Sequence, residues 1–117
     1  MRIHHVALEV IKLEEAVSFY KNVLGFREEY RLNVSDENIV FLLQGDFRIE
    51  LIGNEYSKHI HDRIHFCFEI ECLQEIMKML EKNGCKLLEG PLSLSNGWDT
   101  VFYRGPHGEV LEFLETS

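Results

Sequence analysis

The sequence predicts an α+β fold built from two βαβββ modules, because the chain repeats one order of elements. In each half, a strand-like segment carrying a histidine comes first, an apolar helical stripe follows, and a strand-like segment carrying a glutamate comes last. The opening segments are 3–10 and 63–70, and the closing segments are 47–52 and 109–114. The repeat also extends into the helices, since Leu13 and Leu73 stand 60 residues apart at the start of each stripe.

The first half predicts five elements. Alternating apolar and polar residues over 3–10 indicate a strand, and the apolar spacing from Leu13 to Leu24 indicates a helix. Gly25 follows, where a helix end favours a residue that adopts positive φ. Three more strands are expected at about 26–32, 39–44 and 47–52.

The second half predicts the same order. A strand over 64–70 precedes a helical stripe that starts at Leu73 and ends near Gly84. The later strands are expected at 86–88, 98–104 and 109–114. Residues 90–97 form the longest irregular stretch and are predicted to be a mobile loop over a site. The polar junction at 54–62 divides a single domain, 1–117, into modules of about 1–55 and 62–117.

Composition restricts the function classes. The chain has 117 residues and a formal net charge of -8 without a basic cluster, which disfavours nucleic acid and anionic membranes as partners. No apolar run approaches the roughly 18 residues of a membrane-spanning helix, and the N-terminus shows no secretory pattern. Three cysteines without C-x-x-C spacing favour a reducing compartment, so we expect a cytoplasmic protein.

Strand parity places the repeated histidines and glutamates on faces that can line a polar cleft. His5 and His65 lie opposite the large apolar side chains of their strands, and Glu112 is bracketed by apolar residues. A carboxylate in that setting needs a cation or hydrogen bonds. A lone strand histidine is more often structural, but four matched positions favour one divalent metal site. The predicted ligands are His5, Glu50, His65 and Glu112.

Other candidates receive the plainer interpretation. His4 should face away from His5, and His59 and His61 lie in the polar junction as solvated linker histidines. Cys67 shares the face of His65 and is expected to be a small filler rather than a ligand. Aromatic residues available for a substrate pocket, although strand aromatics more often belong to the core, are Phe41, Phe47, Tyr56, Trp98, Phe102 and Tyr103.

The chain resembles the vicinal oxygen chelate superfamily, which includes glyoxalase I, extradiol dioxygenases, fosfomycin-resistance thiol transferases, methylmalonyl-CoA epimerase and bleomycin-binding proteins. The resemblance covers essentially the whole chain. Its motifs are His5-Val6-Ala7-Leu8-Glu9-Val10, Phe19-Tyr20-Lys21-Asn22-Val23-Leu24-Gly25-Phe26 and Gly105-Pro106-His107-Gly108-Glu109-Val110-Leu111-Glu112. It implies two βαβββ modules curled into a half-open barrel around a metal, with pairing into a homodimer.

Within that family, the order His5, Glu50, His65, Glu112 is similar to the ligand set of glyoxalase I. The resemblance implies a lyase that isomerises the hemithioacetal of methylglyoxal and a small thiol through a metal-stabilised enediolate. The metal would be nickel, cobalt, zinc or manganese. The base would be Glu112 as first choice and Glu50 as second.

The same resemblance implies substrate contacts at Asn54 and Glu9, and Trp98, one of the available aromatic residues, is the third substrate-contact candidate. At Glu9 the sequence departs from bacterial glyoxalase I, which usually has an arginine there for a glutathione carboxylate. The thiol can therefore differ from glutathione, or the substrate can be unrelated. The alternatives are an epimerase, thiol transferase or dioxygenase of the same superfamily, or a metal-free protein that binds a small molecule.

Overall fold

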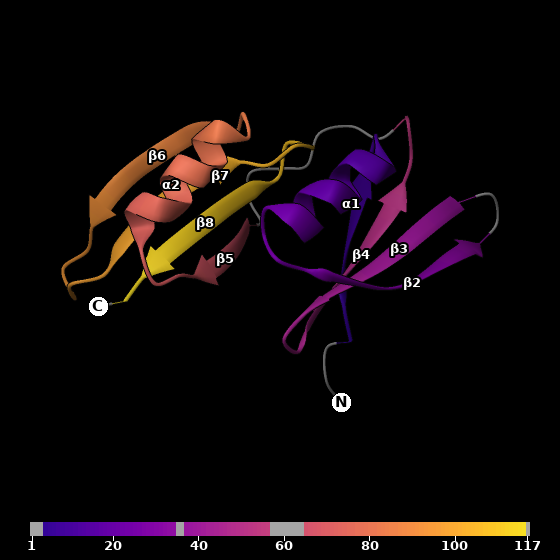
Figure 1. Cartoon of the computed structure of the whole chain (residues 1–117), viewed down its shortest axis with the longest axis horizontal. Helices are drawn as coiled ribbons and strands as arrows, with labels where there is room; N and C mark the ends of the chain where they lie inside the picture. The colour runs from indigo at the N-terminus through magenta and orange to yellow at the C-terminus, as the bar shows by residue number, and fades with distance from the viewer. Residues whose placement is uncertain (1–3, 35–36, 57–64, 117) are drawn as a thin grey trace. The chain divides into compact units, whose positions relative to one another are not determined.

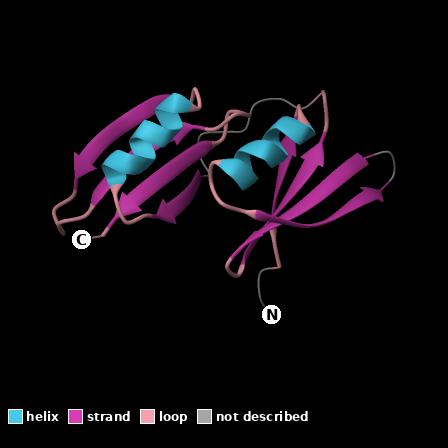
Figure 2. Ribbon diagram, in the orientation of Figure 1, coloured by secondary structure: helices cyan, strands magenta, loops and turns pink. Residues whose placement is uncertain are grey.

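The computed structural model describes residues 4–34, 37–56 and 65–116. The chain divides into two compact units, Met1–Lys58 and His59–Ser117. Each unit contains one four-stranded sheet and one α-helix that lies across a single face of that sheet (Figures 1 and 2). The opposite face of each sheet is the one that carries the repeated histidine and glutamate.

In unit 1 the order of elements is β-α-β-β-β. The elements are β1 (Val6–Val10), α1 (Leu13–Asn22), β2 (Arg27–Val34), β3 (Glu37–Gln44) and β4 (Phe47–Gly53). The strands are ordered β1-β4-β3-β2 across the sheet. The first strand pairs in parallel with the last, and the other pairs are antiparallel.

Unit 2 repeats this topology. Its elements are β5 (His65–Glu69), α2 (Leu73–Lys82), β6 (Lys86–Ser93), β7 (Asp99–Arg104) and β8 (Val110–Glu115), with the strands ordered β5-β8-β7-β6. Strands β5 and β8 are parallel, as β1 and β4 are. The predicted pair of βαβββ modules is therefore confirmed, and both sheets are open, with an edge strand on each side.

The core of each unit lies between its helix and its sheet. Helix α1 contacts β3 and β4, and α2 contacts β7 and β8. The fully buried side chains include Tyr20 of α1 with Leu42, Ile49 and Leu51 in unit 1, and Leu80 of α2 with Val101, Tyr103 and Leu111 in unit 2. Burying such side chains is the main term that stabilises each layer pair.

Both helices end shortly before the predicted glycines, α1 at Asn22 and α2 at Lys82. Gly25 and Gly84 each have φ of +78°, and the chain then turns back on the helix. The amide of Phe26 donates to the carbonyl of Tyr20 at 2.9 Å, and the amide of Cys85 donates to the carbonyl of Leu80 at 3.0 Å. These bonds satisfy carbonyls that the helix end leaves open, which is why glycine stands at both places.

The predicted loop over 90–97 is only partly correct. Strand β6 continues to Ser93, and its pairing resumes with Leu92 opposite Thr100, so the irregular stretch is shorter than expected. The strand passes this point because Gly90 has φ of +97° and lies directly over the carbonyl of Thr100. Strand β1 also starts later than predicted, at Val6, where its pairing with Ile49 of β4 begins.

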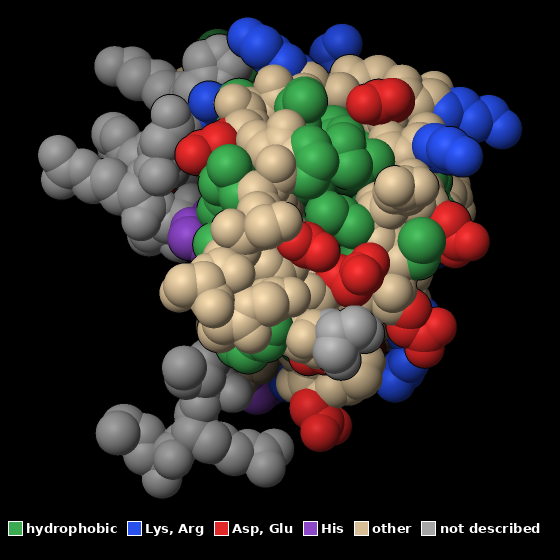
Figure 3. All heavy atoms as spheres, turned by 90° about the vertical axis from the view of Figure 1, so that its left-hand side faces the viewer, with side chains coloured by type: hydrophobic (Ala, Val, Ile, Leu, Met, Phe, Trp, Pro, Cys, Tyr) green, Lys and Arg blue, Asp and Glu red, His purple; other side chains and the backbone are tan. Residues whose placement is uncertain are grey.

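The surface is rich in carboxylates, in keeping with the net charge of -8. Figure 3 shows hydrophobic side chains gathered near the middle of one side, with acidic side chains next to them. The large hydrophobic side chains exposed in unit 2 are Met79, Leu87, Leu92, Leu94 and Trp98. Within the described ranges, no helix is long and apolar enough to cross a membrane.

Candidate metal centre

The two glutamates of the repeat occupy the same register in their sheets. Glu50 on β4 lies between Ala7 of β1 and Phe41 of β3. Glu112 on β8 lies between Cys67 of β5 and Phe102 of β7. Because paired residues share a face of a sheet, each glutamate stands in a row with one small residue and one phenylalanine.

In unit 1, His5 lies one residue before β1 and approaches Glu50. The Nε2 atom of His5 lies 3.3 Å from Oε1 of Glu50, and the side chains are 33% and 15% exposed. The imidazole also packs edge-on against Phe41, with ring centroids 5.3 Å apart. The phenylalanine limits the orientation of the ring, so the Nε2 atom is directed at the carboxylate.

In unit 2 the same arrangement brings His65 to Glu112. Nε2 of His65 lies 3.0 Å from Oε1 of Glu112, and His65 packs edge-on against Phe102 with centroids 5.8 Å apart. Here a third group takes part. The hydroxyl of Thr100 donates to Oε2 of Glu112 at 2.6 Å, and Thr100 itself is 2% exposed. Glu112 is therefore held through both of its oxygens.

Among the residues of unit 1 that the structure describes, the Thr100 contact has no equivalent. The position two residues before Phe102 is Thr100, and the position two residues before Phe41 is Ile39. Both are buried, and both face the last strand of their sheets: Ile39 pairs with Ile52, and Thr100 with Leu114. Two carboxylates in matched registers thus have different surroundings.

The donor groups suit a divalent ion. Two ligands at right angles on an ion, with bonds of about 2.0–2.2 Å, stand about 3 Å apart, and both His–Glu pairs have that spacing. Imidazole nitrogen with carboxylate oxygen is a common donor set for zinc, nickel, cobalt and manganese. Within the described ranges no three His, Cys, Asp or Glu side chains cluster at metal-binding spacing, so each unit supplies a pair.

His4 does not behave as predicted. Its Nδ1 atom lies 2.9 Å from Nδ1 of His5, and the two rings meet edge-on. The expected opposite facing fails because both residues precede β1, where strand alternation has not yet begun. This contact occupies Nδ1 of His5, so Nε2 is the ring nitrogen directed at Glu50.

Cys67 lies beside Glu112 in the register. Burial of the thiol raises the pKa of Cys67 to about 11, and the negative charge of Glu112 adds to the shift. The thiolate is the form that binds metals and attacks electrophiles, so these surroundings keep Cys67 as a thiol. The interpretation of Cys67 as a small filler of the row stays a prediction, since a bound cation would favour the thiolate.

Two of the three predicted substrate residues lie together. The side-chain amide of Asn54 donates from Nδ2 to Oε1 of Glu9 at 2.8 Å. Unit 2 has a matching bond, from the hydroxyl of Thr116 to Oε2 of Glu69 at 3.1 Å. Each bond joins the end of the first strand to the residue after the last strand. The third candidate, Trp98, lies in unit 2 in the turn before β7 and is 39% exposed.

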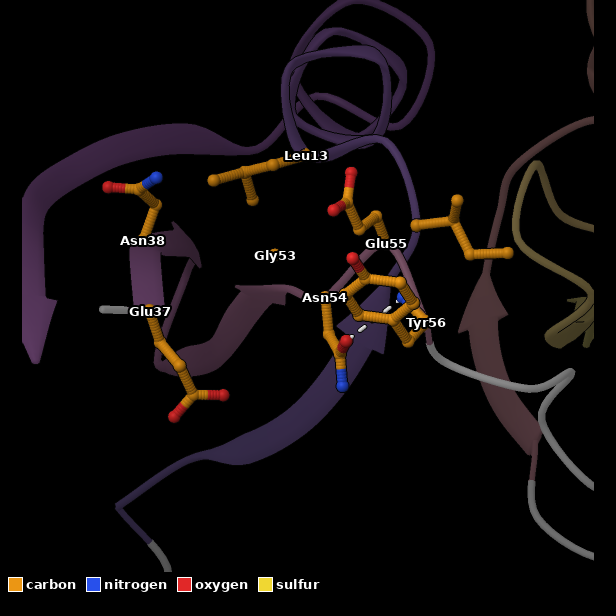
Figure 4. A pocket seen from close by; sticks show the side chains of 8 residues that line it. Leu13, Glu37, Asn38, Gly53, Asn54, Glu55 and Tyr56 are labelled. Carbon is orange, nitrogen blue, oxygen red and sulfur yellow. Dashed lines mark hydrogen bonds between the residues drawn. The ribbon is translucent and has the colours of Figure 1, made fainter. Parts of the chain in front are cut away.

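A cavity of about 540 Å³ opens beside Asn54 in unit 1 (Figure 4). Leu13 and Gly53 contribute apolar surface, and the side chains of Glu37, Asn38 and Glu55 are directed around the opening. Its full lining is Ile11, Leu13, Glu37, Asn38, Gly53, Asn54, Glu55 and Tyr56. His5 and Glu50 are not part of this lining, so the cavity is separate from the His–Glu pair.

Arg48, the cation nearest in sequence to Glu50, is already engaged. Its guanidinium bonds both oxygens of Glu29, at 2.6 and 2.9 Å, and also the carbonyl of His4 at 3.2 Å. The hydrogen bonds from Arg48 hold the pKa of Glu29 below its ordinary value. A bidentate pair of this kind leaves little capacity to bind an anionic substrate group.

Sequence reasoning missed Thr100. A threonine on a strand gives no signal by itself, and its role follows only from the register that sets it diagonally to Glu112. His59 and His61, interpreted as linker histidines, lie outside the described residues.

Comparison with known proteins agrees with this architecture. The family model for the Glyoxalase/Bleomycin resistance protein/Dioxygenase superfamily matches residues 2–113. Human mitochondrial methylmalonyl-CoA epimerase is 26% identical over 97% of this chain, which spans 65% of the length of the epimerase.

Two solved structures share the fold. Glyoxalase I of Leishmania major, described as trypanothione-dependent, has a TM-score of 0.84 and 23% identity, covering 99% of this chain and 87% of that one. A mutant of the fosfomycin resistance protein FosX of Listeria monocytogenes, in complex with Mn(II) and 1S,2S-dihydroxypropylphosphonic acid, has a TM-score of 0.85 and 15% identity, covering 99% and 92%. With the family model matching nearly its whole length, the chain belongs to the glyoxalase/bleomycin resistance/dioxygenase superfamily.

Proposed function

We propose that this protein is a metal-dependent lyase of the glyoxalase type. Its substrate is the hemithioacetal of a 2-oxoaldehyde such as methylglyoxal and a small thiol, and its product is the thioester of the corresponding 2-hydroxy acid. The reaction moves one proton between neighbouring carbon atoms and the hydroxyl proton between their two oxygens, and no atom is gained or lost.

The observation that carries the proposal is the repeated His–Glu pair. The pairs have the same register and similar spacing, and both exposed imidazoles turn Nε2 to a carboxylate. We propose that His5, Glu50, His65 and Glu112 together bind one nickel, cobalt or zinc ion, through one chain or through two in a homodimer. The Mn(II) complex of a protein with the same fold supports a divalent ion.

The side chains have separate roles. A bound divalent ion supplies Lewis-acid polarisation of the substrate oxygens, which acidifies the adjacent C–H bond. One of the two glutamates, Glu112 or Glu50, takes that proton and returns it to the next carbon, as a general base followed by a general acid. Asn54, Glu9 and Trp98 are proposed to contact the substrate.

The charges near the first pair disfavour glutathione as the thiol. Glu9 holds the place where bacterial glyoxalase I usually has an arginine, and it is bonded to Asn54. Arg48 is occupied by Glu29. A thiol without carboxylates avoids repulsion by Glu9, so we propose that the natural thiol is less anionic than glutathione.

A panel of metals and thiols tests the function. The purified protein is first analysed for bound metal, then stripped with a chelator and reloaded with nickel, cobalt, zinc or manganese. Each form is assayed with methylglyoxal and either glutathione or a neutral or cationic thiol, by following thioester formation. We expect turnover with at least one metal and none in the stripped protein. No bound metal and no turnover with any combination would favour a small-molecule-binding protein instead.

A second candidate is an epimerase of a 2-substituted acyl thioester. The similarity to methylmalonyl-CoA epimerase favours it, because epimerisation uses the same proton removal beside a carbonyl. Incubation with methylmalonyl-CoA in deuterated water distinguishes the two. Deuterium incorporation at the carbon beside the thioester, without methylglyoxal activity, would support the epimerase.

The remaining expectations concern the protein in its cell. We propose a homodimer in the cytoplasm. Light scattering coupled to size-exclusion chromatography measures the oligomeric state, and a mass near twice that of the 13.8 kDa chain is expected.

A further inference from the structure

We propose that Thr100 is a positioning residue that fixes Glu112 as the permanent carboxylate ligand, and that Glu50 is the glutamate that exchanges the proton with substrate. This inference rests on the proposed function, because it assigns different tasks to the two carboxylates of that site. It reverses the order of the two candidate bases that the family resemblance implies.

The first step is the contact at Glu112. A hydroxyl group donates one hydrogen, and the hydroxyl of Thr100 lies 2.6 Å from Oε2 of Glu112 and 3.1 Å from the carbonyl of Phe113. The shorter contact, to a charged acceptor, is the stronger bond. Thr100 is 2% exposed, so water does not compete for that hydrogen.

The second step concerns what remains of Glu112. With Oε2 bonded to Thr100, Oε1 is the oxygen directed at Nε2 of His65, 3.0 Å away. Rotation of the carboxylate would break the Thr100 bond and leave a buried hydroxyl with only its longer contact. Glu112 is therefore held as a ligand through one oxygen.

The third step is the contrast with Glu50. The position that matches Thr100 is Ile39, which has no group to donate and is 7% exposed. In the part of the chain that the structure describes, the polar contact recorded for the Glu50 carboxylate is the 3.3 Å approach of His5. Phe41 and Ile39 offer apolar surface on the same face, so rotation of Glu50 breaks no second hydrogen bond.

The consequence is a division of labour. A base that leaves its ligand position, takes a proton from one carbon and returns it to the next must turn twice in each cycle. Glu50 meets that requirement, because a single weak contact restrains it. Glu112 keeps its orientation throughout, because Thr100 holds Oε2.

The experiment is a titration of chelator-treated protein with Co²⁺ alone, followed by calorimetry and by the visible absorption of the ion. Thr100→Val keeps the shape and removes the hydroxyl, Thr100→Ser restores a hydroxyl, and Ile39→Thr places one at the matched position of unit 1. Circular dichroism melting confirms that each variant is folded.

We expect Thr100→Val to weaken Co²⁺ binding about 10–100-fold, the usual effect of removing a partner that orients a ligand. Its Co²⁺ absorption should also change, because the Glu112 carboxylate is no longer limited to Oε1. Thr100→Ser should restore both properties. Ile39→Thr should keep the affinity but lower kcat, because the new hydroxyl restrains Glu50.

The outcomes separate the two proposals. If the unsubstituted protein binds no Co²⁺, the proposed metal-dependent function fails, and the role of Thr100 fails with it. If it binds Co²⁺ and Thr100→Val binds equally well with the same absorption, the metal site stands and the role of Thr100 is wrong. If Thr100→Val does not fold, Thr100→Ser and Ile39→Thr still decide: unchanged kcat in Ile39→Thr overturns the assignment of Glu50.

Discussion

The two units of this chain have the same topology, the same helix stop and the same row of small residue, glutamate and phenylalanine. They differ at single positions beside that row, where unit 2 has Thr100 and unit 1 has Ile39. The shared features determine which atoms face a ligand. The different ones determine how firmly each atom is held, so a repeated framework can provide two carboxylates with different tasks.

The units also differ at their edge strands. In unit 1, Arg31 of β2 bonds Glu14 of α1 and Glu28 of β2, at 2.7 to 3.1 Å. In unit 2, Gly90 of β6 lies so close to β7 that a Cβ atom there would stand 2.9 Å from the carbonyl of Thr100. In unit 1, exposed ion pairs connect the edge strand β2 to helix α1. In unit 2, close backbone packing holds the edge strand β6 against β7.

The largest expected effect comes from removing one imidazole. If both pairs bind a single ion, His5→Ala and His65→Ala should each leave little ion bound at concentrations that saturate the unsubstituted protein, because only three of the four ligands remain and water takes the fourth position. Calorimetric titration with Ni²⁺ or Co²⁺ measures the stoichiometry. Retention of half of the sites in either variant would show that each pair binds its own ion.

The next effect separates the two glutamates. Glu50→Gln should lower kcat about 10²–10⁴-fold, the range for loss of a general base, while Co²⁺ remains bound. Glu112→Gln should mainly weaken Co²⁺ binding, because it removes the fixed ligand. Steady-state assays with methylglyoxal and an active thiol, at saturating Co²⁺, give the comparison. The reverse pattern would assign the base to Glu112.

A moderate effect is expected at the close edge of unit 2. Gly90→Ala combines positive φ, which costs about 1–2 kcal/mol for a non-glycine residue, with overlap on the Thr100 carbonyl, which costs about 1–3 kcal/mol more. Gly97→Ala is the matched control, because its φ is +92° and its Cβ meets nothing within 4 Å. Urea unfolding measures both. An equal decrease in the free energy of unfolding in the two variants would show that the close approach of Gly90 to Thr100 does not affect stability.

The smallest effect is expected at the charged edge of unit 1. Arg31→Gln should cost about 0–1 kcal/mol at neutral pH, since the ion pairs are exposed. Hydrogen bonds from Arg31 hold the pKa of Glu14 and Glu28 below their ordinary value of 4.5. Their contribution is therefore present above that value and is lost as pH falls through the lowered pKa. Unfolding curves at pH 7 and about pH 2 should show a difference that disappears in acid.

A pH-independent difference between Arg31→Gln and the unsubstituted protein would assign the effect to packing of the arginine stem.

Much of the fold was predictable because the signals are local. Period-2 alternation, the helical stripes and the glycines at 25 and 84 each depend on neighbouring residues, and both βαβββ orders are confirmed. The errors lie where a distant strand decides. Strand β6 continues past Gly90 because Leu92 and Ser93 pair with β7. His4 turns to His5 because the pairing of β1 with β4 begins only at Val6.

The site shows the same division. Parity along each strand predicted the faces of the repeated histidines and glutamates, and the structure brings each histidine to its glutamate within a unit. The hydroxyl that distinguishes the two carboxylates depends on the register of β7 against β8, which no local pattern encodes. The sequence likewise contains no signal for the Glu9–Asn54 bond, since these residues lie 45 positions apart.

Each His–Glu pair joins a histidine just before β1, or at the first residue of β5, to the last strand of its unit. The parallel pairing of first and last strands is only five residues long in each sheet. An ion held by such a pair would bind the closed unit and not the opened one. Occupancy would therefore be linked to folding, by about 2.7 kcal/mol at an ion concentration 100 times the Kd. In a cell with scarce metal, the abundance of the intact protein would then follow metal supply, as its activity does.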